Sequence, residues 1–425
     1  MVRTALVHEW FTTLAGSESV VEQLCHLYPE ADLFAIYADP AVIAATEYLR
    51  DRRIETSFIK HLPLAARSFR SYLLLMPLAV EQFDLSHYDL VISSNHAAAK
   101  GVLTGPDQLH ISYVHSPIRY AWDLQHQYLR EARLDTGMKG WLAKWMLHRM
   151  RIWDYRTAAG VDYFVANSRY VARRIAKVYG RHADVIYPPV DVERFGFTEA
   201  KGDFYLAASR LVPYKRMDLI VEAFAAMPDK RLVVIGDGSE AEKVKAKAAP
   251  NVELLGYQPG HVLREMMQRA RAFVFAAEED FGIIPVEAQA CGTPVIAFGK
   301  GGALETVRGP AHARPTGLFF PRQDVASIVE AVERFEAEQD RFEPSACREN
   351  AERFSTARFA AEFGAYAERC WSEFKSKTQG ERGLVSSADS RVSEYPGYVP
   401  LRSGIPGVDD EAGLYEEHER LHASG

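Results

Sequence analysis

The chain has 425 residues, 48% of them hydrophobic and 25% charged, which is the composition of an ordinary globular protein long enough for two domains. Its formal net charge of −7 argues against a general nucleic-acid binder. The four cysteines are far apart and form no Cys-x-x-Cys pair, which favours a reducing cytoplasm and argues against a structural zinc site. The sequence enters an apolar run at once and has no apolar stretch of about 18 residues, so we expect neither a signal peptide nor a membrane-spanning helix.

In the first half, short apolar runs separated by helical segments predict a doubly wound α/β sheet. The first strand is expected at residues 4–7, a loop at 8–15, and a helix from Gly16 to about residue 27. Gly16 lacks the further glycines of G-x-G-x-x-G, which disfavours a nicotinamide or flavin enzyme, and on sequence alone it is equally well explained as an ordinary turn glycine. The other strands are expected at residues 32–36, 89–93, 110–115, 162–166 and 184–187, with a helix at 168–179.

Some stretches of the first half carry side chains that suit a function. Residues 113–122, YVHSPIRYAW, follow a predicted strand, so His115 is expected at the sheet edge where such folds bind ligands; the alternative is a structural histidine. Residues 59–77 and 140–153 are apolar with basic charges, and the second of these segments also holds tryptophans. Such segments fit an anionic membrane surface, or else they are core helices whose basic side chains reach solvent.

A stiff segment at residues 188–195, which begins with two prolines, predicts the boundary between two domains. We therefore expect domains at residues 1–187 and 188–353, a long amphipathic helix at 354–375 and a disordered tail rich in Ser, Gly and Pro at 376–425. The tail holds one candidate acidic helix, at residues 411–421. Strands of the second domain are expected at residues 204–209, 232–238, 252–258, 272–277, 295–298 and 314–320, with helices between them and at 325–335.

The turn at residues 278–282 carries the chemistry of the second half. Gly282 lets the backbone of residues 281–284 approach an anion at the start of a helix, where free amides and the helix dipole favour negative charge. Glu279 precedes that helix and Glu287 lies about one turn inside it, so both side chains are expected to reach one crevice. A phosphate site between carboxylates suits a sugar nucleotide, whose hydroxyls need acceptors; the alternative is that acidic residues simply favour helix N-termini.

The segment EDFGIIPVE at residues 279–287 resembles the Glu-x(7)-Glu motif of the retaining nucleotide-sugar glycosyltransferases of family 4, which have the GT-B fold. Residues 288–295 (AQACGTPV) and 299–306 (GKGGALET) resemble the same family. The resemblance extends over residues 2–375 and implies two Rossmann-like domains that face a cleft, with the last helix crossing back to the first domain. Asp280 is a departure, because glycine is commoner at this position of the family.

The resemblance assigns the donor mainly to the second domain. Arg210 and Lys215, which follow a predicted strand, would bind the diphosphate, and Glu279 would hold hydroxyls of the sugar. His115 would contact the sugar from the facing domain. These four are the expected catalytic residues, and no protein nucleophile is expected. The other donor-binding residues implied are Gly16, Asp280 at the sugar, Phe281, Gly282, Ile283, Ile284, Glu287 at the ribose and Tyr257 at the base, and Arg119 is expected on the acceptor side.

The resemblance implies a retaining transferase with a nucleotide sugar as co-substrate. No Asp-x-Asp follows a predicted strand, so we expect no metal and no other cofactor, with the basic pair neutralising the diphosphate. The motifs are most similar to those of bacterial polysaccharide mannosyltransferases, which implies GDP-mannose as donor and a lipid-linked or polysaccharide acceptor at the inner face of the cell membrane. The alternatives are a UDP-sugar-dependent glycosyltransferase, a sugar-nucleotide epimerase and a non-catalytic nucleotide-sugar binder.

Overall fold

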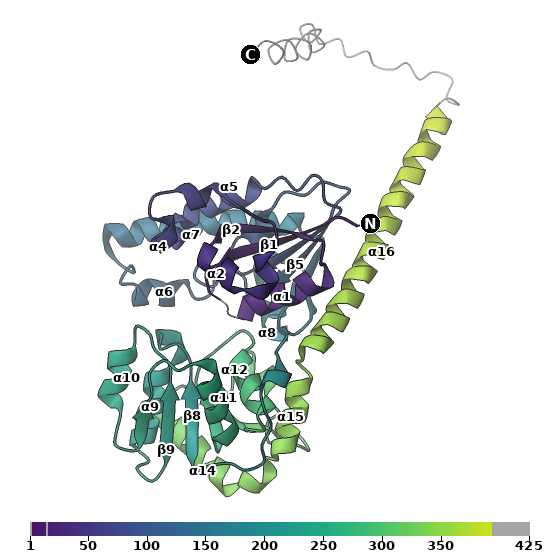
Figure 1. Ribbon diagram of the computed structural model, residues 1–425. Helices are drawn as coiled ribbons and strands as arrows, with labels where there is room; N and C mark the ends of the chain where they lie inside the picture. Colours follow the sequence, from purple (N-terminus) through teal and green to yellow (C-terminus); the bar gives the residue numbers. More distant parts are fainter. Residues whose placement is uncertain (1, 14–15, 393–425) are drawn as a thin grey trace. The chain divides into compact units, whose positions relative to one another are not determined.

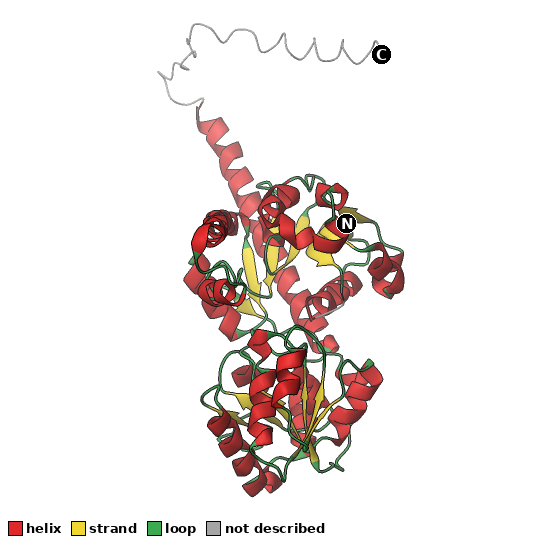
Figure 2. Ribbon diagram, turned by 90° about the vertical axis from the view of Figure 1, so that its left-hand side faces the viewer, coloured by secondary structure: helices red, strands yellow, loops and turns green. Residues whose placement is uncertain are grey.

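The computed structural model describes residues 2–13 and 16–392, with side chains described up to residue 378. The chain contains two parallel β-sheets flanked by helices (Figure 1, Figure 2). The first sheet has the order β3-β2-β1-β4-β5-β6-β7, and its strands are β1 (Thr4–Phe11), β2 (Asp32–Ala38), β3 (Ile54–Thr56), β4 (Leu90–Asn95), β5 (Leu109–Val114), β6 (Tyr163–Ala166) and β7 (Asp184–Val185). The second has the order β10-β9-β8-β11-β12-β13, with strands β8 (Phe204–Ala208), β9 (Arg231–Ile235), β10 (Val252–Leu254), β11 (Ala272–Phe275), β12 (Val295–Phe298) and β13 (Gly317–Phe320).

Helices connect the strands in both halves, and the local sequence explains several of their ends. The side chain of Ser168 accepts a hydrogen bond from the amide of Val171 at the start of α8, and Gly180 ends this helix with a left-handed φ of 64°. The α-helices of the first half are α1 (Gly16–Leu27), α2 (Pro40–Ala45), α3 (Glu47–Arg50), α4 (Ala65–Ser68), α5 (Met76–Glu81), α6 (Gln125–Glu131), α7 (Gly137–Thr157) and α8 (Arg169–Tyr179). Those that follow are α9 (Met217–Ala225), α10 (Ala241–Lys247), α11 (Gly260–Arg269), α12 (Ile283–Ala290), α13 (Ala303–Thr306), α14 (Val325–Ala337), α15 (Pro344–Glu352) and α16 (Thr356–Val392).

The central strands β8, β11 and β12 of the second sheet are buried on both faces, because helices cover both. In β8 every residue is buried, and alternate side chains belong to different cores: Tyr205 and Ala207 pack into one, and Phe204, Leu206 and Ala208 into the other. A strand buried on both sides has no polar face, which explains why these strands are continuous apolar runs in the sequence. The α/β fold class expected from the sequence is confirmed.

β1 extends to Phe11, so the expected loop at residues 8–15 is wrong for residues 8–11. The polar side chains in this part suggested a loop, but the folded chain satisfies them internally. The carboxylate of Glu9 accepts hydrogen bonds of 2.8–3.1 Å from the amides of four consecutive residues, His96, Ala97, Ala98 and Ala99. A buried charge that accepts several hydrogen bonds is tolerated inside a sheet. The sequence around Glu9 does not predict these partners.

In each sheet the strand order reverses at one point, and sheets of this kind bind ligands at the carboxyl ends of the strands there. The reversal lies between β1 and β4 in the first sheet and between β8 and β11 in the second. The segments that follow these strands carry Gly16, His96, Arg210 and Glu279. Candidate residues from both halves therefore lie where this topology leaves a crevice.

The segments around Val190 and Ser355 lie side by side. Val190 forms a parallel bridge with Ser355, and its amide donates a 2.8 Å hydrogen bond to the carbonyl oxygen of Phe354. Near the start of α16, the ring centroids of Phe359 and Phe363 lie 5.8 and 6.3 Å from that of Tyr113 in β5. The domain limits expected from the sequence, at residues 1–187 and 188–353, stay predictions.

α16 continues to Val392, whereas the sequence predicts a disordered tail from residue 376. Extending an existing helix by one residue costs less than starting a new one, so a segment of weak periodicity can continue a helix that began earlier. The candidate acidic helix at residues 411–421 lies outside the described residues. In the part of the chain that the structure describes, no helix is long and apolar enough to cross a membrane.

Candidate active site

A cavity of about 1200 Å³ lies at the carboxyl ends of both sheets and is lined by residues from both halves. Its volume suits a ligand of the size of a nucleotide sugar. Tyr257 is 78% exposed and is not one of the lining residues, so its contact with a base stays a prediction. The lining contains the other residues that the sequence singled out: Gly16, His115, Arg119, Arg210, Lys215, Glu279, Asp280, Phe281, Gly282, Ile283, Ile284 and Glu287.

The N-terminal ends of α1 and α12 meet at this cavity. α12 begins directly after Gly282, whose φ of 85° lies in the left-handed region that favours glycine. A Cβ atom on Gly16, the first residue of α1, would lie 2.5 Å from Cδ1 of Ile283, the first residue of α12, so the two helices start close together. Both helix starts present free amides and the positive end of a dipole, which is an arrangement that binds phosphate.

Two cations border the same part of the cavity. Arg210 follows β8, and Lys215 ends the short 3-10 helix η6 (Pro213–Lys215). The Nζ atom of Lys215 contacts the carboxylate of Glu279. Burial, together with the positive charges of Arg210 and Arg119, lowers the pKa of Lys215 to about 7. A bound diphosphate would bring negative charge and favour the protonated lysine.

A Gly-Asp-Gly turn after β9 supports the backbone on both sides of Arg210. A Cβ on Gly236, whose φ is 143°, would lie 1.8 Å from the carbonyl oxygen of Ser209, and one on Gly238 would lie 2.4 Å from that of Leu211. Only glycines let the turn lie this close to the neighbouring backbone. This support was not anticipated from the sequence, although two glycines directly after a strand are a signal for it.

Glu287 lies on α12 and differs chemically from Glu279. Burial raises the pKa of the Glu287 carboxyl to about 7, and the charge of Arg194 only partly opposes this. Near neutral pH this group is therefore partly protonated and can donate as well as accept a hydrogen bond, and either suits a ribose hydroxyl. Among residues 2–13 and 16–392, no three His, Cys, Asp or Glu side chains are grouped so that they would hold a metal ion.

His115 faces the cavity from the end of β5 and belongs to a chain of buried polar groups. Its Nε2 lies 2.9 Å from Oγ of Ser94, which lies 3.1 Å from Nδ1 of His8. Nε2 of His8 lies 3.6 Å from the carboxylate of Glu18, another lining residue. Burial, with His96 and His8 close by, lowers the pKa of His115 to about 3, so the imidazole is neutral at pH 7.

The part of the cavity wall formed by the first half is acidic and aromatic. Besides Glu18, its side chains include Glu22, Glu47, Tyr48 and Tyr120. Carboxylates accept hydrogen bonds from sugar hydroxyls, and an aromatic face packs against the apolar face of a sugar ring. These residues were not predicted from the sequence, because they are scattered over several segments and form no motif.

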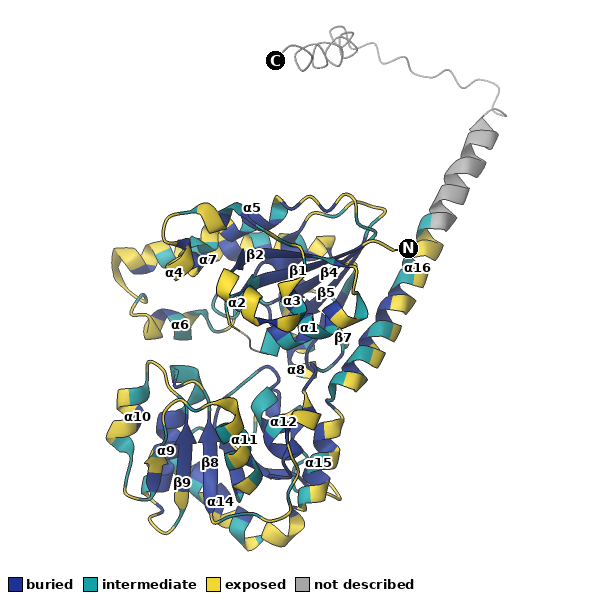
Figure 3. Ribbon diagram, viewed as in Figure 1, coloured by how far each residue is buried: buried dark blue, intermediate teal, exposed yellow. Residues whose placement is uncertain are grey.

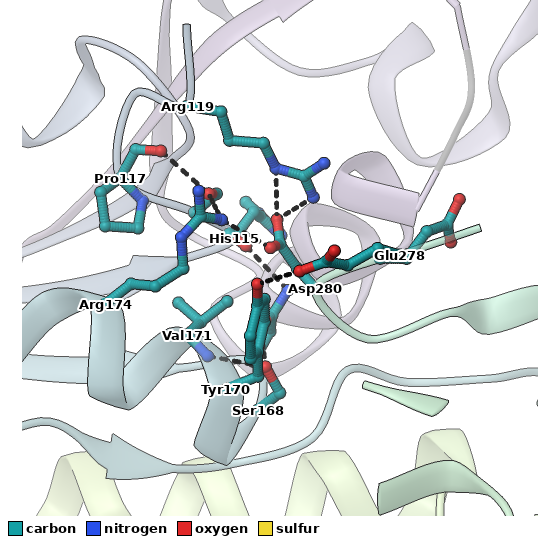
Figure 4. Close-up of polar contacts among 12 residues, drawn as sticks. His115, Pro117, Arg119, Ser168, Tyr170, Val171, Arg174, Glu278 and Asp280 are labelled. Atoms are coloured by element: carbon teal, nitrogen blue, oxygen red, sulfur yellow. Dashed lines mark hydrogen bonds and ion pairs between the residues drawn. The ribbon is translucent and has the colours of Figure 1, made fainter. Parts of the chain in front are cut away.

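Asp280 is held by two arginines of the first half (Figure 4). Its Oδ2 accepts a 2.7 Å hydrogen bond from Nε of Arg119, and its Oδ1 accepts one of 2.7 Å from Nη1 of Arg174. Contact of Asp280 with sugar hydroxyls stays a prediction, and in this structure both of its oxygens already accept hydrogen bonds. Arg174 was not singled out in the sequence, since nothing near it in the chain points to a site.

Solved structures share the architecture of this chain. Sucrose-phosphate synthase from Thermosynechococcus elongatus has a TM-score of 0.67 and 18% identity, over 88% of this chain and 100% of that chain. Anabaena HepE in complex with UDP has a TM-score of 0.62 and 16% identity, over 86% of this chain and 100% of that chain. At such identities the likeness shows the fold alone, and that fold is GT-B.

Two family models match consecutive parts of the chain. Residues 14–194 match the model described as Glycosyltransferase Family 4, and residues 191–354 match the model described as Glycosyl transferases group 1. Together they extend over residues 14–354, which include the residues that line the cavity. The chain belongs to the glycosyltransferases that these two models describe.

The names of curated relatives of the chain specify different substrates. A GDP-mannose-dependent monoacylated alpha-(1-6)-phosphatidylinositol monomannoside mannosyltransferase of Corynebacterium glutamicum is 33% identical, over 40% of this chain and 52% of that protein. A D-inositol 3-phosphate glycosyltransferase of Mycobacteroides abscessus is 28% identical, over 40% of this chain and 43% of that protein. The chain thus spans about half the length of the curated relatives it matches.

Proposed function

We propose that the chain is a retaining hexosyltransferase that moves a sugar from a nucleoside diphosphate to a hydroxyl of an acceptor. One observation supports this above others: a single cavity joins a basic end to a wall of hydroxyl-binding groups. The basic end has Arg210, Lys215 and two helix N-termini, which suit a diphosphate. The wall has His115 and several carboxylates, which suit sugar hydroxyls.

In this proposal the protein stabilises the charges that develop during transfer. Arg210, Lys215 and the amides at the start of α12 stabilise the departing diphosphate. Because Lys215 contacts Glu279, a diphosphate that binds Lys215 also sets the position of Glu279 beside the sugar. His115 is neutral, so it binds a sugar hydroxyl without repelling the positive charge that grows on the sugar ring.

For the donor we propose GDP-mannose, supported by the resemblance of residues 279–287 and 299–306 and by relatives named for GDP-mannose. A UDP-sugar is the second candidate, because HepE, a structure with this fold, was solved with UDP. Product inhibition separates the two. If UDP inhibits at least about ten times better than GDP, a difference of about 1.4 kcal/mol, the GDP-mannose proposal is wrong while the transferase proposal stands.

For the acceptor we propose a neutral sugar at the end of a lipid-linked or polysaccharide glycan. Glu18, Glu22 and Glu47 on the first-half wall accept hydrogen bonds from hydroxyls and repel phosphate. Arg119, a cation on this wall, is already paired with Asp280. The phosphate of a lipid carrier is therefore expected outside this part of the cavity.

We also propose that the first half binds an anionic membrane surface through α7. Basic residues flank the exposed apolar side chains of this helix, among them Lys139, Lys144 and Arg149. Trp153 of α7 donates a 2.7 Å hydrogen bond to Glu81 of α5, which places the two helices side by side. Exposed residues lie on both helices (Figure 3). The large apolar ones on or close to these helices are Leu74, Leu75, Leu78, Met138, Trp141, Leu142, Trp145, Ile152 and Tyr155.

The transferase proposal is tested with purified protein, a panel of GDP- and UDP-sugars, and glycan acceptors with and without a lipid carrier. Binding of the right donor at about 100 times its dissociation constant should stabilise the protein by about 2.7 kcal/mol. We expect transfer to the acceptor, retention of anomeric configuration and no loss of turnover in EDTA. Conversion of the donor without any acceptor would indicate an epimerase, and binding without turnover on any acceptor would indicate a non-catalytic binder.

A further inference from the structure

Asp280 connects the loop between β11 and α12 to the first half of the chain through both carboxylate oxygens (Figure 4). Oδ2 accepts hydrogen bonds from Nε and Nη2 of Arg119, and Oδ1 accepts one from Nη1 of Arg174. Asp280 is 6% exposed, so these charge-assisted hydrogen bonds form away from bulk water, where they are strong. They join segments more than 100 residues apart in the sequence.

Arg174, on α8, extends this cluster within the first half. It donates a 3.0 Å hydrogen bond from Nη1 to Oγ of Ser116 and pairs with Asp123 through Nη2. Two arginines thus face two aspartates, and the arginine side chains are largely buried. Without the charge of Asp280, the two guanidinium groups would be left close together with Asp123 as their remaining anion in this cluster.

Two other acidic residues of the second half also bind α8. Glu305 accepts hydrogen bonds of 2.8 and 2.9 Å from the amides of Arg169 and Tyr170, which are free donors at the helix start. Glu278 accepts a 2.6 Å hydrogen bond from the hydroxyl of Tyr170. Of these three acidic residues, Asp280 is the one that also lines the cavity.

We propose that Asp280 is a positioning residue, which holds the β11–α12 loop and its neighbour Glu279 against the first half of the chain while the sugar is transferred. This inference rests on the proposed transferase function. Movement of the loop would shift Glu279 and its partner Lys215 relative to His115. Arg210, Lys215 and the start of α12 belong to the second half, and the start of α1 belongs to the first, so diphosphate binding should depend less on Asp280 than sugar transfer does.

Kinetics of Asp280→Asn test the proposal, because this change keeps the shape of the side chain and removes its charge. We expect kcat to fall at least about 30-fold, whereas the dissociation constant of the nucleoside diphosphate, measured by calorimetry, changes less than about threefold. Glu278→Gln is the matched control, since glutamine still accepts from the hydroxyl of Tyr170, and it should cost less than about threefold. If Asp280→Asn weakens donor binding as much as it slows turnover, Asp280 contacts the substrate directly and the proposal is overturned.

A second change should rescue the first. Arg174→Met, added to Asp280→Asn, removes one of the two guanidinium groups that share Asp123 as their remaining anion, without altering a residue of the cavity lining. The kcat of the double variant should be at least about threefold higher than that of Asp280→Asn alone. If the double variant loses kcat by the product of the losses in the two single variants, the proposal is overturned.

Hydrogen exchange tests the same connection without turnover. The amides of Arg169 and Tyr170 are bonded to Glu305 of the other half, so a peptide covering residues 168–174 should exchange at least about tenfold faster in Asp280→Asn than in the wild type or Glu278→Gln. If the wild type transfers no sugar, the transferase proposal fails, and this exchange rate still decides whether Asp280 holds the two halves together. Unchanged exchange in a folded Asp280→Asn variant would overturn the connection itself.

Discussion

The Oγ atom of Ser94 lies 2.9 Å from Nε2 of His115, which orients the imidazole ring that faces the cavity. The hydrogen bond uses one ring nitrogen and leaves Nδ1 for a ligand. Because burial lowers the pKa of His115 to about 3, the ring carries no charge at pH 7, and its orientation decides what it binds.

Ser94→Ala should therefore lower kcat about tenfold while the KM for the donor changes little, because the ring loses its anchor but the diphosphate site is untouched. Initial rates over a range of donor concentrations measure both quantities. Ser112→Ala is the control, since Ser112 is also buried in the first sheet and accepts a 3.0 Å hydrogen bond from Ser93. Equal losses in both variants would assign the effect to the sheet rather than to His115.

Lys215→Ala should reduce turnover at saturating donor at least about 100-fold, because a buried charge beside the diphosphate matters most as negative charge builds up on the leaving group. Lys243→Ala is the matched control: Lys243 pairs with Asp218 at 3.0 Å and does not line the cavity. Turnover close to that of the wild type in Lys215→Ala would falsify the catalytic role.

Nucleotide binding should take up protons above neutral pH. The pKa of Lys215 is lowered to about 7 by burial and neighbouring arginines, so at pH 8 most of the lysine is neutral in the ligand-free protein. A diphosphate raises this pKa, so binding at pH 8 should take up close to one proton per nucleotide, and binding at pH 6 almost none. Calorimetry in two buffers of different ionisation enthalpy measures the uptake. Persistence of the full uptake in Lys215→Ala would assign it to another group.

Glu287 should link the stability of the protein to pH. Burial raises its pKa to about 7 in the folded protein, from the ordinary 4.5 that it regains on unfolding. The stability associated with the protonated carboxyl is complete below pH 4.5 and is lost as the pH rises through 7. Glu287→Gln, which stays neutral, should be more stable than the wild type by about 3 kcal/mol at pH 8 and by less than about 1 kcal/mol at pH 5. Calorimetric melting at both pH values checks this; a glutamine variant that melts lower than the wild type at pH 8 would contradict it.

Leu142→Asp should weaken binding to anionic vesicles at least about fivefold, because it places a negative charge on the exposed side of α7. Co-sedimentation at low salt with vesicles of mixed neutral and anionic lipids measures the binding. Leu304→Asp makes the same change at a residue of the second half that is exposed to a similar degree, 52% against 49% for Leu142, and should bind like the wild type. Equal weakening by both changes would mean that net charge, rather than α7, governs binding.

The sequence by itself determined the α/β class, most strands and the loop that carries Glu279, Gly282 and Glu287. These features are local. A buried strand needs a continuous apolar run, and a helix that begins at a phosphate site needs a glycine and free amides within a few residues. Arg210, Lys215 and His115 were also found from the sequence, because each follows a strand and the carboxyl ends of parallel strands share one edge of the sheet.

The tertiary structure alone decided the partners of the buried polar groups. The sequence predicts a loop at Glu9, and only the folded chain brings the amides of residues 96–99 to its carboxylate. Likewise, no sequence pattern predicts that Ser94 orients His115. The same holds for Asp280, whose arginines lie more than 100 residues away in the chain. A buried charge must find hydrogen-bond partners wherever the folded backbone brings them, and no repeating pattern along the chain records that choice.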